Sequence, residues 1–191
     1  MCQFQQFRFP SSDGSSSCYA GAWLPPEEPR GVVQIVHGVG EHIGRYETAA
    51  RFLTRQGFLV CGEDHLGHGN TVQDGRYGAF APQNGWKLVV ADIARLRRIQ
   101  GEKHPGVPYF LLGHSMGSFL TRTYLIDYPG TVDGAILSGT GQEPAPLVAF
   151  GKLLAGLECR RLGYDGVSPL VDRLSLGAYN RRFRPNRTSA D

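Results

Sequence analysis

Residues 107–117 read Val-Pro-Tyr-Phe-Leu-Leu-Gly-His-Ser-Met-Gly, a short apolar run followed by a turn built from glycine and serine. The apolar run predicts a buried β-strand, and the pattern after Ser115 predicts a helix that begins inside the turn. Gly113-His114-Ser115-Met116-Gly117 has the G-x-S-x-G form of a nucleophile elbow, which presents a serine hydroxyl at a sharp strand-to-helix bend. Gly113 and Gly117 are expected because the serine backbone is strained and the strand and helix come close together.

Strand and helix patterns alternate around this turn, from residue 32 to residue 138. Short apolar runs at 32–36, 58–62, 109–112 and 132–137 predict strands, of which the first two are nearly all apolar, as in strands covered on both faces. Residues 3–9 and 18–23 predict an opening hairpin. The alternation predicts an α/β fold, with a mostly parallel sheet, flanking helices and right-handed crossovers.

Helices are expected at three places between these strands. One follows residue 46 and ends at Gly57, which suits a left-handed C-terminal cap. Another spans the region around residue 90, with an apolar stripe formed by Trp86, Val89, Val90, Ile93 and Leu96. Its opposite, solvent-facing side is expected to carry Lys87, Asp92, Arg95 and Arg98. The third covers residues 116–128.

The alternation stops near residue 143. We therefore expect a core of residues 1–143, and in residues 144–191 the beginning of a helical insertion, or cap, that is incomplete at residue 191. Residues 147–157 predict a short apolar helix, interrupted by Gly151 and Gly156, that either lines an acyl pocket or packs on the core. Beyond it lies an excess of arginine, which indicates either a surface for anionic head groups or an ordinary solvated insertion.

Bulk composition excludes several classes of protein. The net charge of +3 is too small to indicate a nucleic-acid partner, and membrane contact is expected to be transient at most. The N-terminus has no signal-peptide pattern and no run of about 18 apolar residues occurs, so a cytoplasmic protein is expected. The four cysteines form no C-x-x-C spacing, and we expect free thiols, no metal and no cofactor.

Three glycine-rich polar loops, at 37–44, 63–70 and 113–117, each follow a predicted strand. Ligands bind beyond the carboxyl ends of strands in such sheets, so the loops are expected to converge on one crevice. There Ser115 would attack an ester carbonyl. The backbone N–H groups of Met116 and of Val39, which follows Gly38, would stabilise the oxyanion by about 3–4 kcal/mol each.

All six histidines precede Ser115, namely His37, His42, His65, His68, His104 and His114. Triads of this architecture run serine, then acid, then histidine along the chain, so the triad Asp and His are expected to be absent from these residues. The histidines follow separate strands without helical i, i+4 spacing, which argues against a metal site. We expect Asp64 and His65 to form a local hydrogen-bonded pair that fixes the second loop, with no catalytic role for His65.

The three loops together resemble the monoacylglycerol lipase and lysophospholipase group of α/β-hydrolases. The resemblance rests on residues 37–42 with Arg45-Tyr46, on residues 64–69 and on the elbow, and residues 176–180 look like the start of the group's cap. It implies an α/β-hydrolase fold with a helical cap, acting on single-chain lipid esters through an acyl-enzyme on Ser115, without cofactor or obligate protein partner. Peptidase, thioesterase and haloperoxidase activities share this scaffold and stay open.

The chain departs from this group in one respect. The group's later Asp and His would fall beyond residue 191, so we expect a fold truncated before its last strands and inactive by itself. The rival interpretation is a non-catalytic α/β module that binds a lipid or a protein partner without turnover.

Overall fold

The computed structural model describes residues 2–163 and 166–175, and these residues form two compact units, divided after residue 140. The expected start of a cap at residues 176–180, and the arginines that follow it, lie outside the described residues.

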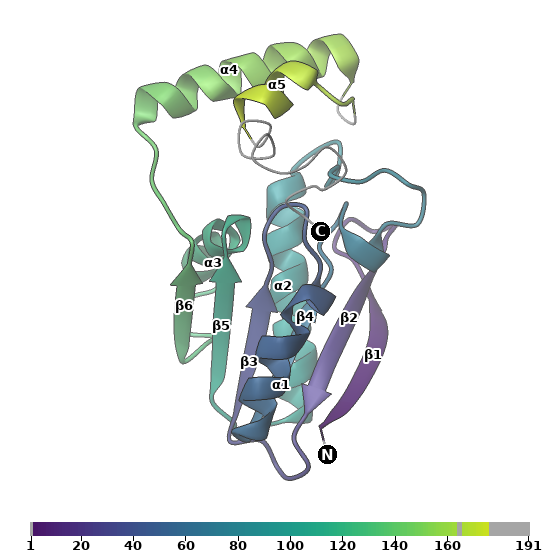
Figure 1. Cartoon of the computed structure of the whole chain (residues 1–191), viewed down its shortest axis with the longest axis vertical. Helices are drawn as coiled ribbons and strands as arrows, with labels where there is room; N and C mark the ends of the chain where they lie inside the picture. Colours follow the sequence, from purple (N-terminus) through teal and green to yellow (C-terminus); the bar gives the residue numbers. More distant parts are fainter. Residues whose placement is uncertain (1, 164–165, 176–191) are drawn as a thin grey trace. The chain divides into compact units, whose positions relative to one another are not determined.

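The first unit is built on a six-stranded mixed sheet with the order β1-β2-β4-β3-β5-β6 (Figure 1). Its strands are β1 (Gln3–Pro10), β2 (Ser17–Leu24), β3 (Gly31–Val36), β4 (Phe58–Glu63), β5 (Tyr109–His114) and β6 (Gly134–Ser138). The β1–β2 hairpin joins β4 in antiparallel orientation, whereas β4, β3, β5 and β6 run parallel. The predicted α/β fold with a mostly parallel sheet is confirmed.

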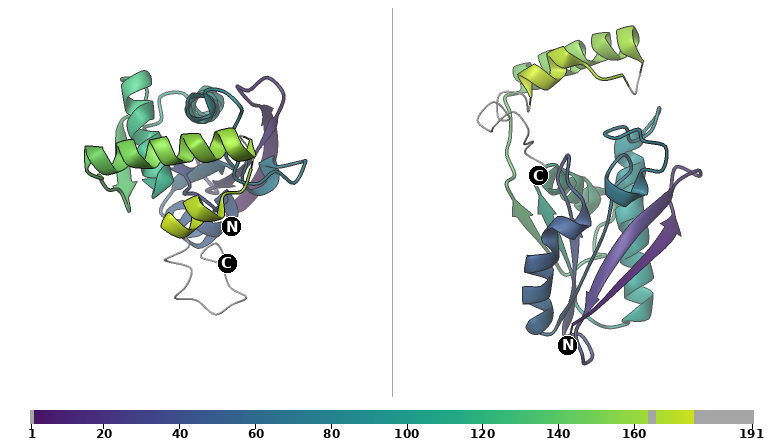
Figure 2. Two further views of the ribbon diagram at one scale, coloured as in Figure 1. Left: turned by 90° about the horizontal axis from the view of Figure 1, so that it is seen from above. Right: turned by 45° about the vertical axis from the view of Figure 1, so that its right-hand side comes forward.

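Three helices cover the two faces of this sheet (Figure 2). Helix α1 (Glu47–Arg55) packs on one face, while α2 (Gly85–Lys103) and α3 (Met116–Asp127) pack on the other. Alternation along β3 divides its side chains between two apolar clusters: Val33 and Ile35 join the α1 side, and Val32 and Val36 join the α2 and α3 side. Gly57 has φ +86°, as expected of the residue that ends α1.

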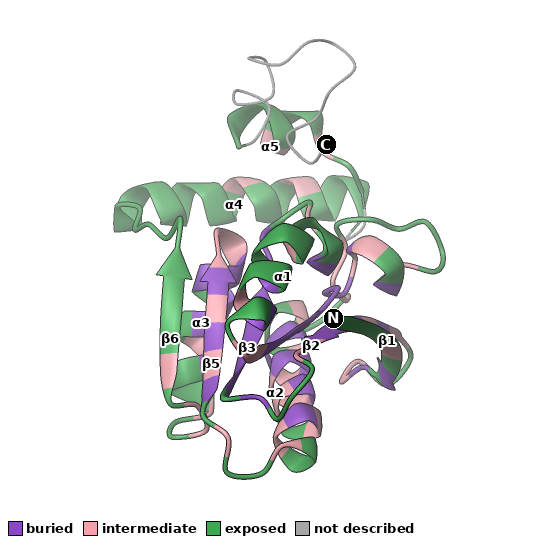
Figure 3. Cartoon of the chain, turned by 60° about the horizontal axis from the view of Figure 1, so that its bottom comes forward, coloured by how far each residue is buried: buried purple, intermediate pink, exposed green. Residues whose placement is uncertain are grey.

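Burial falls steeply from the centre of the sheet to its β6 edge (Figure 3). All six residues of β3 are buried, whereas Ile136 in β6 is 54% exposed. Strand β6 begins at Gly134 rather than at residue 132. The reason is that Asp133 bonds Tyr109 twice, through its N–H to the Tyr109 carbonyl and through its carboxylate to the Tyr109 N–H.

The expected solvent-facing position of Asp92 on α2 is wrong, because its side chain is buried. The Ser11 hydroxyl and the Ser12 N–H each donate to its carboxylate at 2.6 Å, and the Cys18 thiol lies 3.4 Å from it. These donors compensate a buried charge that would otherwise be costly. Asp92 therefore ties the β1–β2 hairpin to α2. Trp86, at the start of the same apolar stripe, lies at its rim and donates to Thr123.

The second unit contains α4 (Ala145–Leu162) and α5 (Pro169–Leu174). Helix α4 runs without a break through Gly151 and Gly156, so the expected interruption is wrong; a single glycine costs a helix only about 1 kcal/mol. The Ser168 hydroxyl accepts from the Val171 N–H and caps α5. Within residues 2–163 and 166–175, no helix has the length and apolar character that crossing a membrane requires.

Two short 3₁₀ turns complete the first unit. The first, η1 (Ile43–Tyr46), follows β3 and leads into α1, and the second, η2 (Gly69–Thr71), follows β4. Each turn therefore belongs to one of the polar loops that leave the carboxyl ends of the parallel strands.

Candidate active site

Ser115 stands at the bend between β5 and α3 with a strained backbone, φ 52° and ψ −120°. Only glycine adopts this region readily, so a serine here stores about 1–3 kcal/mol of strain. Hydrogen bonds to β6 and from α3 hold it in place. The Ser115 N–H donates to the Ser138 carbonyl at 2.9 Å, and the Ser118 hydroxyl donates to the Ser115 carbonyl at 2.6 Å. Ser115 therefore lies at a strained bend between a strand and a helix, and its role as a nucleophile stays a prediction.

The two elbow glycines lie where a side chain has no room. A Cβ on Gly117 would overlap the carbonyls of Val36 and His37, and one on Gly113 would overlap the Thr121 hydroxyl and the Gly117 carbonyl. Helix α3 can therefore start directly against the end of β3.

The loop after β3 passes close to Ser115. A Cβ built on Gly38 would lie 3.1 Å from the Ser115 Cβ and 3.3 Å from the His114 carbonyl oxygen. The Gly38 N–H donates to Glu41 Oε2 at 2.8 Å, and the Tyr46 hydroxyl donates to the same oxygen at 2.7 Å. Burial, reinforced by Glu41, raises the pKa of Tyr46 and keeps this hydroxyl a donor.

Glu41 and Tyr46 therefore fix the loop, and the Gly38 N–H is already hydrogen-bonded to Glu41. The backbone N–H groups of Val39 and Met116 make no hydrogen bond within the described residues, and neither does the Ser115 hydroxyl. Sequence reasoning placed Glu41 and Tyr46 in a motif but assigned them no role. Their spacing of five residues, across the turn before α1, was the available signal.

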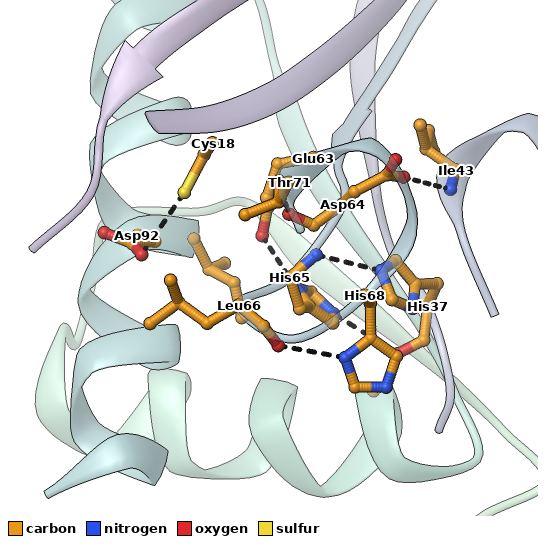
Figure 4. Close-up of polar contacts among 12 residues, drawn as sticks. Cys18, His37, Ile43, Glu63, Asp64, His65, Leu66, His68, Thr71 and Asp92 are labelled. Carbon is orange, nitrogen blue, oxygen red and sulfur yellow. Dashed lines mark hydrogen bonds and ion pairs between the residues drawn. The ribbon is translucent and has the colours of Figure 1, made fainter. Parts of the chain in front are cut away.

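The second loop is fastened to the first by Asp64 (Figure 4). Its two carboxylate oxygens accept from the Ile43 N–H and the Asn70 N–H, each at 2.7 Å, and its carbonyl accepts from the Thr71 hydroxyl at 2.6 Å. Gly69, with φ +48°, passes so close that a Cβ there would overlap the Asp64 carboxylate. The two loops thus meet at the carboxyl end of the sheet, as expected.

The expected pairing of Asp64 with His65 is wrong. Adjacent residues leaving a strand point to opposite faces, and His65 Nδ1 instead lies 3.2 Å from Glu63 Oε1, both side chains being fully buried. The His65 backbone N–H donates to His37 Nε2 at 3.0 Å, and the two imidazole rings stack with centroids 3.9 Å apart. His37 and His65 therefore belong to the interior beneath the loops.

Burial keeps these imidazoles neutral. It lowers the pKa of His37 well below its usual range and that of His65 to about 3, with neighbouring histidines adding to both effects, and it lowers the pKa of His68. His114 points elsewhere, its Nδ1 lying 3.2 Å from the Ser138 hydroxyl. None of the six histidines, all of them described, bonds to Ser115. Nor do the described residues contain a cluster of His, Cys, Asp and Glu suited to a metal ion.

Comparisons with known proteins agree with this architecture. The profile of the family described as "Serine aminopeptidase, S33" matches residues 27–166. A monoacylglycerol lipase of Mycolicibacterium smegmatis is 36% identical over 156 residues, covering 76% of this chain and 54% of the relative. Human monoglyceride lipase is 35% identical over 115 residues, covering 60% of this chain and 36% of the relative.

A solved structure extends the likeness to almost the whole chain. The thermostable carboxyl esterase from Bacillus coagulans, in complex with glycerol, superposes with a TM-score of 0.82 at 32% identity, over 98% of this chain and 60% of the esterase. The chain thus spans about half the length of the curated relatives it matches. The family match covers most of the first unit and reaches into the second. The chain therefore belongs to the serine aminopeptidase S33 family, as an α/β-hydrolase of the monoglyceride lipase kind.

Proposed function

We propose that this polypeptide is the nucleophile-bearing part of a serine hydrolase that cleaves carboxylic esters of single-chain lipids, of the monoacylglycerol lipase or lysophospholipase type. The observation that carries the proposal is the strained backbone of Ser115, held between β5 and α3 with Gly38 against it. Strain of this kind persists where the surrounding structure enforces it, and it is characteristic of reactive positions.

In the proposed reaction the Ser115 hydroxyl oxygen attacks the ester carbonyl carbon and forms a tetrahedral oxyanion. The N–H groups of Val39 and Met116, which have no acceptor in the described structure, would donate to that oxygen. Met116 also begins α3, whose N-terminal dipole favours a negative charge. Collapse of the intermediate expels the alcohol and leaves an acyl-enzyme on Ser115, which water then hydrolyses.

A general base is the missing element of this mechanism. The buried histidines are neutral and occupied by neighbouring backbone groups, and His114 faces Ser138. We therefore propose that the activating imidazole and its acid come from polypeptide outside these 191 residues, and that the chain alone turns over poorly. Loss of a triad histidine in a comparable hydrolase lowers turnover by about 10⁶-fold.

We infer the substrate class by analogy with relatives, which are monoacylglycerol lipases and a carboxyl esterase. A small lipid ester is the proposed substrate, with no nucleic-acid partner, no cofactor and at most transient contact with a membrane surface. The cytoplasmic location stays a prediction.

Labelling by a fluorophosphonate tests the nucleophile. We expect slow modification of Ser115 in this chain, none in Ser115→Ala, and fast modification once a segment carrying a later histidine is joined to it. The native chain is compared with urea-unfolded chain, in which the elbow no longer exists. Equal rates of Ser115 labelling in folded and unfolded protein would contradict the proposal.

The alternative, a non-catalytic lipid- or partner-binding module, is favoured by one observation, the absence of a base bonded to Ser115 among the described residues. If Ser115 stayed unlabelled even in the extended protein, while a monoacylglycerol still bound, this alternative would replace the hydrolase.

A further inference from the structure

A chain of five buried polar side chains runs through the first unit outside the immediate surroundings of Ser115. It begins at Tyr109 on β5, passes Gln34 on β3 and Glu63 on β4, and ends at His65 and His37 in the two loops. All five are at most 1% exposed. The mechanism proposed above uses none of them, and buried polar groups of this kind are costly unless each is satisfied.

The lower half of this chain has a definite donor direction. The Tyr109 hydroxyl donates to Gln34 Oε1 at 2.6 Å, which leaves the Gln34 amide nitrogen to donate. That nitrogen donates to the Ile93 carbonyl at 3.1 Å and to Glu63 Oε2 at 3.4 Å. Oε2 of Glu63 is therefore an acceptor, and its other oxygen, Oε1, faces His65.

The upper half fixes the tautomer of His65. Its Nε2 lies 3.3 Å from the His37 carbonyl oxygen, which can only accept, so Nε2 carries a hydrogen. In a neutral ring Nδ1 is then bare, and it lies 3.2 Å from Glu63 Oε1 (Figure 4). Neither atom has a hydrogen-bond partner in the described structure, and their mutual contact does not meet hydrogen-bond geometry. Two bare acceptors at this distance would repel, and a proton shared between them removes that repulsion.

The surroundings place this proton on Glu63. Two neighbouring carboxylates, Asp92 on α2 and Asp64 next in the chain, disfavour a further negative charge on Glu63. The Cys18 thiol on β2 and the Tyr109 phenol on β5 also interact electrostatically with Glu63, and Arg97 lies over the Tyr109 ring, 5.1 Å from its centroid.

His65 in turn stacks on His37, and its ring centroid is 6.4 Å from that of His68. Burial raises the pKa of Glu63 well above its usual range and lowers that of His65 to about 3, and both shifts favour the neutral forms.

His65 holds the loop beside Ser115 at two points, since its ring donates from Nε2 to the His37 carbonyl and its backbone N–H donates to His37 Nε2. His37 accepts from the His65 N–H at Nε2, so its Nδ1 carries a hydrogen and donates to the Gly38 carbonyl at 2.8 Å. That carbonyl and the Val39 N–H belong to the same planar trans peptide and point in opposite directions. Fixing the carbonyl therefore aims the N–H.

We propose that Glu63 is a positioning residue: it acts as a buried neutral carboxylic acid that donates its proton to His65 Nδ1 and, through His65 and His37, aims the Val39 N–H toward the oxyanion formed at Ser115. The role of the Val39 N–H rests on the proposed function, whereas the protonation of Glu63 does not. The residue is buried under the loops and touches no reacting atom.

Two variants separate the loss of the ionisable carboxyl group from the loss of a hydrogen-bond donor at residue 63. Glu63→Gln keeps a neutral donor that can face His65 and an acceptor for Gln34, whereas Glu63→Met keeps similar volume and removes both. The readouts are ¹⁵N NMR of the His65 ring, the ¹H–¹⁵N signal of Val39 and the rate at which a fluorophosphonate labels Ser115. Infrared difference spectra of wild type and Glu63→Gln add the carbonyl stretch of a protonated glutamic acid.

In wild type we expect a neutral Nε2–H ring from about pH 5 to pH 8, the range in which an unperturbed histidine titrates. Glu63→Gln should keep this tautomer and the Val39 signal, with labelling within about twofold of wild type. Glu63→Met should lose the tautomer, shift Val39 and label about tenfold more slowly, since a whole oxyanion donor is worth about 10²–10³-fold.

An imidazolium or Nδ1–H ring in wild type would overturn the proposal, as would equal behaviour of the Gln and Met variants. If Glu63→Met does not fold, the wild-type ring signal and the Gln comparison still decide. If Ser115 is unlabelled in every variant the hydrolase proposal fails, yet the ring and infrared measurements continue to test the protonated Glu63.

Discussion

The elbow at Ser115 and the histidine cluster of His37 and His65 lie at the same end of the sheet and differ in how their polar groups are used. At the elbow the backbone is strained and the serine hydroxyl has no partner in the described structure. In the cluster the backbone is relaxed, and each ring nitrogen faces a neighbouring polar group. The reactive position is therefore a hydroxyl without a partner on a backbone held in place by its surroundings, whereas the buried rings of the cluster position the loops.

Gly117→Ala should disrupt the bend at Ser115 and cause the largest loss of stability of the variants considered. The added Cβ would overlap the Val36 and His37 carbonyls at the end of the central strand, and backbone there cannot move aside. We expect a loss of more than about 4 kcal/mol of unfolding free energy, measured by urea denaturation, or failure to fold. Gly151→Ala in α4 is the matched control, since its Cβ meets nothing and stability should hold or rise. Equal stability of the two variants would contradict the close packing of α3 on β3.

The pH dependence of stability tests the cluster. The pKa values of His37 and His65 are lowered in the folded state, so below about pH 6.5 the unfolded chain binds more protons and stability falls as pH falls. The pKa of Glu63 is raised, so above about pH 4.5 the folded chain binds the extra proton and stability falls as pH rises. Each group contributes about 1.4 kcal/mol per pH unit.

Between about pH 5 and pH 6.5 three histidines with lowered pKa values, His37, His65 and His68, oppose one glutamate, so acidification lowers stability. Above this range only the Glu63 contribution remains, with the opposite sign. Glu63→Gln should remove the alkaline decline and steepen the acid one. Urea denaturation at a series of pH values measures both slopes, and an alkaline slope that persisted in Glu63→Gln would show that Glu63 is ionised in the folded protein.

These two regions also differ in how far the sequence predicts them. The elbow depends on residues that are consecutive in the chain, so Gly113, Ser115 and Gly117 were identified from local pattern. Glu63 and His65 are two residues apart, where an extended chain puts both on one face, whereas the prediction paired His65 with Asp64, its neighbour on the opposite face. The burial of Asp92 depends on Ser11 and Cys18, about eighty residues away, and a helical pattern carries no information about such partners.

Asp64→Asn is expected to loosen the link between the two loops by about 2 kcal/mol, because hydrogen bonds to a charged acceptor are worth about 1.5–3 kcal/mol. The Asn side chain has one acceptor oxygen, so its amide nitrogen would face either the Ile43 or the Asn70 N–H. Asp74→Asn removes an exposed partner of Arg76 and should change stability by about 0.5 kcal/mol or less. Thermal denaturation of the two variants measures the difference, and similar losses would mean that the Asp64 bonds contribute no more than a surface pair.

The strain at Ser115 predicts the smallest change in stability. It also separates the reactivity of Ser115 from the stability of the fold. Ser115→Gly should stabilise the fold by about 1 kcal/mol, because glycine relieves a φ of 52° at ψ −120° and gives back part of the gain as chain entropy. Ser115→Ala keeps the strain and should stay close to wild type. Asn84→Gly is the control at positive φ without an elbow, and its gain should be smaller because asparagine tolerates its left-handed conformation, φ 55° and ψ 22°. Both Ser115 variants should lose fluorophosphonate labelling although only one gains stability; equal stabilities for Gly and Ala would mean that the elbow holds Ser115 without strain.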